Sequence, residues 1–158
     1  MSKTKPNPAP AKPAPAKAAA PLSLADRLLR QGWASVAVWM SVGLLLEGLL
    51  GYKIPAYLND PQRRELFRLA HTHGTLLGVL LVVAALVLAR GATVPEIAVT
   101  ALRVGAVLMP VGFFVAGIWH PESDPGLAVW LVPPGALLVI YAAVAFTLAH
   151  FKKPTADD

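Results

Sequence analysis

Four long stretches of the chain carry almost no charge, and they predict its architecture. The first holds Glu47 as its only formal charge, the third holds Arg103, and the second and fourth hold none. An α-helix of about 20 apolar residues spans a hydrocarbon core of about 30 Å. The pattern therefore predicts an all-α membrane protein, a four-transmembrane-helix bundle with helices at about 31–52, 66–89, 97–119 and 127–149.

Capping residues and prolines predict where these helices begin. Ser23 opens an S-x-x-D start signal for the first helix. Asp60 and Pro61 predict that the second helix begins about two turns before its apolar part. The pair Pro133 and Pro134 predicts that the fourth helix is kinked, or that it starts as a short interfacial turn.

The membrane domain covers residues 23–151, between two polar tails. Residues 1–22 are almost entirely Pro, Ala and Lys, a composition that cannot bury a core and predicts a disordered tail. Residues 152–158 form a short C-terminal tail.

Composition and charge support a membrane setting. Hydrophobic residues make up 56% of the chain and charged residues 15%, whereas a soluble domain has about 25% charged residues. The net charge of +5 does not indicate nucleic-acid binding, because the Lys and Arg lie in tails and loops beside the apolar runs, as in membrane proteins. Cysteine is absent, which excludes disulfides and thiolate chemistry.

The distribution of Lys and Arg predicts the orientation. Ten of the 14 lie on the side of the two termini and four on the other side. The positive-inside rule therefore places both termini in the cytoplasm and the chain in the plasma (inner) membrane as a multi-pass protein. The lipid bilayer is its first predicted partner.

Polar residues from three distant segments are predicted to meet at the outer face. Glu47 lies near the outer end of the first helix, His71 and His73 lie in the outer turns of the second, and His120 lies in the short outer loop with Glu122 and Asp124. A carboxylate within a span is costly and is a functional hypothesis by default. Imidazole changes its charge near neutral pH and suits proton transfer or metal binding.

Helix geometry separates the two neighbouring histidines. His73 lies about 200° around the helix from His71, so a straight helix does not present both to one metal. We expect His71 to face the bundle beside the small-residue stripe of Gly74 and Gly78, and His73 to face another helix, the headgroups or a partner. Gly74 and Gly78 themselves are predicted to serve helix packing.

Glu47 and His71 are therefore the predicted catalytic groups, and His71, His73 and His120 the predicted cofactor ligands. A metal or a haem is compatible with these histidines, but no spacing matches a known metal motif. The structural alternatives are a Glu47 near the interface that is protonated or paired with an arginine such as Arg68, and a His71 that makes an interhelical hydrogen bond.

A basic stripe descends the second helix into the membrane. Its members fall at positions i, i+4, i+7 and i+11, and they are Arg64, Arg68, His71 and Thr75. The stripe predicts either contacts with lipid phosphates or a funnel that leads an anionic or quinone-like substrate toward His71 and Glu47.

A family resemblance covers residues 42–89. This stretch reads VGLLLEGLLGYKIPAYLNDPQRRELFRLAHTHGTLLGVLLVVAALVLA and resembles the first two helices of small, uncharacterised bacterial four-helix membrane proteins. It is also similar to the hydroxylaminobenzene mutase type, which has a Gly-ended helix, a loop with Pro and an Asn-Pro-Arg-like pattern, and Ala-His…Gly at the start of the second helix. The corresponding residues here are Gly51, Pro55, Asn59, Pro61, Arg63, Ala70, His71 and Gly74, with Asp60 between Asn59 and Pro61. The resemblance implies a membrane-bound isomerase of hydroxylamino aromatics and assigns no catalytic residue.

Two hypotheses for the function stay open. One is a small membrane enzyme, of redox or isomerase type, with an outer-face Glu/His site. The other is a non-catalytic accessory or structural subunit of a larger membrane complex, or of a homo-oligomer. A transporter is disfavoured because the charged groups gather at one face, whereas transport sites lie near mid-depth.

Overall fold

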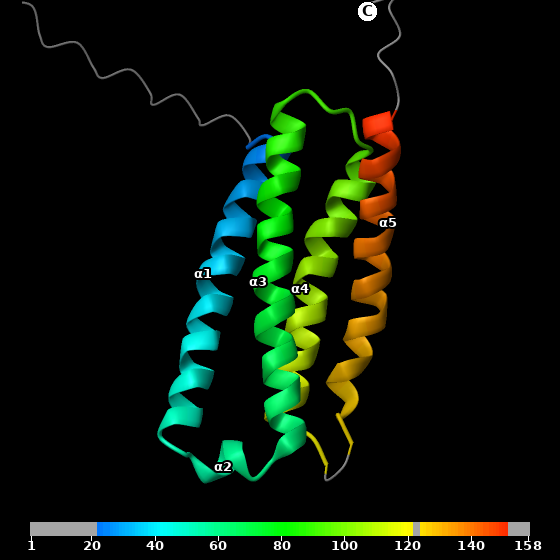
Figure 1. Cartoon of the computed structure of the whole chain (residues 1–158). Helices are drawn as coiled ribbons and strands as arrows, with labels where there is room; N and C mark the ends of the chain where they lie inside the picture. The colour runs from blue at the N-terminus through cyan, green and yellow to red at the C-terminus, as the bar shows by residue number, and fades with distance from the viewer. Residues whose placement is uncertain (1–21, 122–123, 152–158) are drawn as a thin grey trace, which may run out of the picture.

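The computed structural model describes residues 22–121 and 124–151, which are helical over most of their length (Figure 1). The elements are α1 (Leu24–Gly51), α2 (Pro55–Leu58), α3 (Pro61–Ala89), α4 (Glu96–Ile118), the 3-10 turn η1 (Leu127–Leu131) and α5 (Val132–Phe151). The described part of the chain contains no strand, so the all-α prediction is confirmed. Residues 1–21 of the N-terminal tail predicted to be disordered, the C-terminal tail and Glu122 fall outside the described residues.

Four helical segments are long and apolar enough to cross a membrane. They are α1, α3, α4 and the continuous stretch Leu127–Phe151 formed by η1 and α5. Their number agrees with the four nearly uncharged runs of the sequence.

The predicted helix starts are confirmed by their capping contacts. The Ser23 hydroxyl accepts a hydrogen bond from the Asp26 backbone N–H at 3.1 Å. Asp60 accepts one from the Arg63 N–H at 2.9 Å, and Pro61 occupies the first turn of α3. These side chains satisfy N–H groups that have no partner within the helix.

The two outcomes left open for Pro133 and Pro134 are now distinguished. η1 forms a short turn before the prolines, and α5 begins at Val132, so both prolines lie in the first turn of α5. Proline is tolerated there because the first N–H groups of a helix have no intrahelical partner.

The long helices pack in a row, so the bundle is open. α1 packs against α3, α3 against α4, and α4 against α5, while α1 touches α4 only slightly and does not contact α5 (Figure 1). Small residues allow the close approaches, as predicted for the Gly74–Gly78 stripe. A Cβ on Gly78 would lie 3.0 Å from atoms of Ser35 and Val36 on α1.

The two ends of the bundle differ in packing. The main apolar core lies toward the α3–α4 turn, where Leu28, Leu81, Val99 and Leu102 are buried together. At the other end, which we call the α2 end, α1 and α3 diverge and α2 bridges them (Figure 1). A Cβ added at Gly48 or Gly51 of α1 would meet nothing within 4 Å. This divergence leaves room for a site.

Candidate functional site

A cavity of about 710 Å³ lies between α1 and α3 at the α2 end. Its polar lining includes both predicted catalytic residues and two arginines of the basic stripe: Glu47, Arg64, Arg68 and His71. The remaining lining adds Glu65 and Thr72 to a set of largely apolar side chains, among them Met40, Leu44, Leu46, Leu50 and Tyr57. The cavity therefore combines apolar side chains with two guanidinium groups, two carboxylates and an imidazole.

His71 is held in one orientation by a hydrogen bond to α1. Its Nδ1 lies 2.7 Å from the carbonyl oxygen of Trp39. A carbonyl can only accept, so Nδ1 carries the proton in this bond. In the neutral ring the other nitrogen, Nε2, then has a free lone pair, which can accept a proton or bind a metal. The predicted interhelical hydrogen bond and a chemical role are thus compatible in one side chain.

Gly43 makes room for the His71 ring on the surface of α1. A Cβ at position 43 would lie 2.6 Å from Nδ1 and 2.9 Å from Nε2 of His71. Ordinary contacts begin near 3.4 Å, so no larger residue fits without displacing the ring. The sequence alone did not identify Gly43 as the residue against which the His71 ring packs.

Glu47 contributes a carboxylate without a cationic partner in the described chain. No Lys, Arg or His nitrogen of the described residues lies within 4.0 Å of its oxygens. The predicted alternative, an ion pair with Arg68, is therefore not formed, although both residues line the same cavity. The divergence of α1 from α3 explains this, because Glu47 lies four residues before the end of α1.

The basic stripe of α3 reaches the cavity with three of its four members. Arg64, Arg68 and His71 line it, whereas Thr75 does not. The Thr75 hydroxyl is buried and has no hydrogen-bond partner among the described residues. The stripe therefore ends at His71.

His73 points away from this cavity toward α4, as the 200° separation predicts. Its ring centroid lies 5.2 Å from that of Phe113 on α4. Its Nδ1 lies 2.8 Å from the Leu69 carbonyl one turn earlier in its own helix. His73 thus packs between helices and does not share a cavity with His71.

His120 belongs to a second polar cluster at the same end. Its side chain is only 6% exposed, and its Nε2 lies 3.3 Å from Asp60 Oδ2, an ion-pair distance without hydrogen-bond alignment. Asp60 also lies 3.5 Å from the guanidinium of Arg63. Arg63 in turn donates to the carbonyls of Gly117 and Ala56. The cluster ties α2, α3 and the end of α4 together.

The role of Arg63 was not anticipated from the sequence. The capping signal identified Asp60, but its partner His120 is 60 residues away along the chain, so only tertiary packing brings them together.

The three predicted cofactor ligands, His71, His73 and His120, occupy three separate environments. The described residues contain no group of three or more His, Cys, Asp or Glu side chains placed to hold a metal ion.

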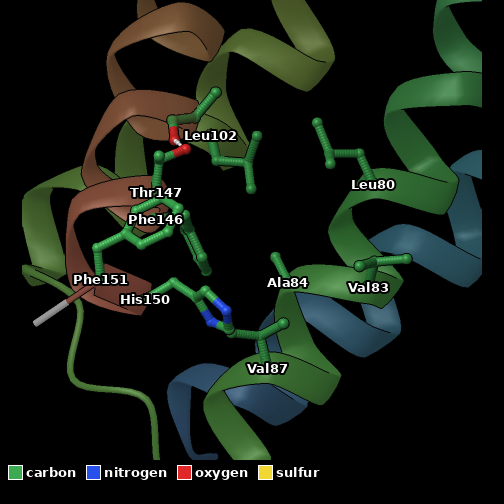
Figure 2. A pocket seen from close by; sticks show the side chains of 10 residues that line it. Leu80, Val83, Ala84, Val87, Leu102, Phe146, Thr147, His150 and Phe151 are labelled. Carbon is green, nitrogen blue, oxygen red and sulfur yellow. Dashed lines mark hydrogen bonds between the residues drawn. The ribbon is translucent and has the colours of Figure 1, made fainter. Parts of the chain in front are cut away.

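A second cavity, of about 330 Å³, lies at the opposite end between α3, α4 and α5. Figure 2 shows its lining, which is apolar apart from Thr147 and His150. The Thr147 hydroxyl already donates to Ala143 at 2.8 Å. This cavity offers little polar chemistry, which leaves the α1–α3 cavity as the stronger site.

Comparisons of the chain with protein-family models, with curated proteins and with solved structures found no match.

Proposed function

We propose that the chain is an integral membrane enzyme that transfers protons on a small amphipathic substrate bound in the α1–α3 cavity. One observation carries the proposal: the oriented imidazole of His71 and the unpaired carboxylate of Glu47 line the same cavity. General acid–base catalysis needs two such groups within reach of one bound molecule.

The rest of the cavity suggests the kind of substrate. Arg64 and Arg68 in its lining offer charge-assisted hydrogen bonds to an anionic or strongly polar group. The apolar wall suits an aromatic or aliphatic body. With the α2 end at the outer face, as the positive-inside rule favours, the substrate enters from the periplasmic side or from the outer leaflet of the inner membrane.

An isomerisation is the reaction class that these residues support most directly. It requires one group to give a proton and another to take one, and both can come from Glu47 and His71. The resemblance of residues 42–89 to the hydroxylaminobenzene mutase type favours hydroxylamino aromatics as the first substrates to test. A redox enzyme is the alternative within the same site, with Nε2 of His71 as a ligand to a metal or a haem.

The test measures conversion of hydroxylamino aromatics by membranes that contain the chain, with products separated by chromatography and identified at unchanged mass. Wild type should form an isomer, and Glu47→Gln and His71→Ala should each lose about 10²-fold or more, the usual share of an acid–base group. Glu96→Gln and His150→Ala, exposed residues remote from the cavity, are the matched controls. Full activity in both cavity variants would refute the assignment.

An optical spectrum and metal analysis of the purified protein distinguish the redox alternative. A Soret band or a stoichiometric metal that His71→Ala removes would support a cofactor site. A colourless and metal-free wild type that still forms the isomer would support the acid–base mechanism.

The exposed outer helix α5 favours a second function, that of an accessory subunit. α5 packs against only one long helix, α4, and exposes Leu137, Ile140 and Val144 among others. Such an edge can dock on another membrane protein or on a second copy. Co-purification of a larger complex in mild detergent would support this function, and a homogeneous monomer would contradict it.

A further inference from the structure

We infer that Gln31 and Arg103 form a binding site for the phosphate of an anionic phospholipid, in the leaflet at the α3–α4 turn end. The site is distinct from the α1–α3 cavity and does not depend on the proposed function. It rests on a charged side chain within a span, on the contacts that orient it, and on the groove that it faces.

Arg103 and Gln31 hold each other through two hydrogen bonds. Arg103 Nε donates to the side-chain oxygen of Gln31 at 2.8 Å. The Gln31 amide nitrogen donates to the backbone carbonyl of Arg103, also at 2.8 Å. This reciprocal pair joins α1 to α4 and fixes the plane of the guanidinium.

The fixed plane leaves the terminal nitrogens of Arg103 available. Only Nε is used by Gln31, and within the described chain no acceptor lies within hydrogen-bond distance of either Nη. Neither Nη is enclosed in the protein, so both reach a surface. Two parallel N–H groups of a guanidinium match the oxygens of a phosphate.

The depth of Arg103 in its helix makes an unsatisfied charge costly there. Arg103 lies seven residues after the first residue of α4, which is about 10 Å along the helix. Gln31 lies seven residues after the first residue of α1, at a similar depth. Arginine at this depth is expensive unless its donors are satisfied or reach the headgroup layer.

The groove beside Arg103 has the polarity gradient of a phospholipid. It has a volume of about 380 Å³ and is lined by Gln31, Thr100, Arg103, Val104, Val107 and Leu108. The polar members lie nearer the helix end, and the apolar members follow toward the middle of the span. A lipid phosphate at Arg103 and Thr100 would therefore place its acyl chain along Val104 and Val107.

The lining also favours an anionic headgroup. It contains no Asp or Glu, so it offers no carboxylate to the ammonium of a zwitterionic lipid. Basic pockets between membrane helices are known to bind anionic headgroups. The same phosphate chemistry could come from a soluble phosphate ester, and the Nη groups could instead meet a carboxylate of another membrane protein.

The experiment measures lipid retention by the full chain, using native mass spectrometry in mild detergent with added phosphatidylglycerol, phosphatidylcholine or glycerol phosphate. Wild type should retain one phosphatidylglycerol, and Arg103→Gln should lower its apparent affinity about tenfold, as expected for a charge-assisted contact. Arg103→Lys keeps the charge but loses the bond to Gln31, and should give an intermediate loss. Arg90→Gln is the matched control, because it removes an exposed arginine at the same end.

Several results would overturn the inference. One is equal retention of phosphatidylglycerol by wild type and Arg103→Gln when both variants are folded by circular dichroism. Others are equal affinity for phosphatidylcholine, full competition by glycerol phosphate, and a stoichiometric protein partner that Arg103→Gln releases. Should Arg103→Gln fail to fold, lipid retention is compared between wild type and Gln31→Met, which keeps the arginine and removes only the bonds that orient it. Gln31→Met should also retain less phosphatidylglycerol than wild type, and equal retention would overturn the inference.

Discussion

Gly43→Ala provides the sharpest test of the α1–α3 cavity. The substitution adds one methyl group to the face of α1 that seats the His71 ring. Because the added Cβ would lie 2.6 Å from Nδ1, the ring must move away from α1. The hydrogen bond to the Trp39 carbonyl, 2.7 Å long, is then lost or strained.

The expected change in the free energy of unfolding combines two destabilising effects and one stabilising effect. The lost hydrogen bond is worth about 1 kcal/mol, and overpacking at a helix contact costs about 1–3 kcal/mol. Replacing glycine by alanine within a helix returns up to about 1 kcal/mol. Gly48→Ala lies on the same helix, and its added Cβ has nothing within 4 Å. It therefore has the stabilising effect of alanine without the two destabilising effects. Gly43→Ala should therefore be less stable than Gly48→Ala by about 2–4 kcal/mol.

The assay is reversible unfolding of the purified protein in mixed micelles with increasing denaturing detergent, followed by circular dichroism. A double-mutant cycle with His71→Ala isolates the contact, because Gly43→Ala should be tolerated once the ring is absent. Nitrogen-15 NMR of the histidines gives a second measurement, the loss of the Nδ1–H tautomer of His71 in Gly43→Ala. Equal stability of the two alanine variants, with an unchanged His71 tautomer, would refute the seating of His71 on Gly43.

Three further predictions use the same unfolding measurement. Asp60→Ala should lower the free energy of unfolding by about 0.5–2 kcal/mol, because the N-cap of α3 is lost. Its effect should not add to that of His120→Ala in a double-mutant cycle, and strict additivity would contradict the contact between the two side chains. Lys53→Gly should stabilise the folded protein by about 1 kcal/mol, because Lys53 has a positive φ of 53° and directly follows Tyr52, the C-cap of α1. A loss of stability would show that the lysine side chain matters more than its backbone conformation. Gly78→Ala should destabilise the folded protein by about 1–3 kcal/mol, since its Cβ would press on the Val36 backbone. Gly51→Ala is the control, because a Cβ at that position would have no neighbour within 4 Å. Similar stabilities for the two variants would contradict the close approach of α1 and α3.

The sequence by itself determined that four helices are long and apolar enough to span a membrane, and where the helices begin. Both depend on local chemistry: about 20 apolar residues satisfy their own backbone within a helix, and caps such as Ser23 and Asp60 act within three residues. It also indicated that His71 and His73 face different neighbours, because helical geometry alone sets their angle.

Tertiary packing decided which side chains meet. The sequence allowed Glu47 to pair with Arg68, but α1 and α3 diverge at the α2 end and leave both residues lining a cavity. The contacts of His120 with Asp60 and of Gln31 with Arg103 join residues 60 and 72 positions apart. No local pattern encodes such pairs, because the order in which the helices pack in the row and the rotation of each helix about its axis determine them.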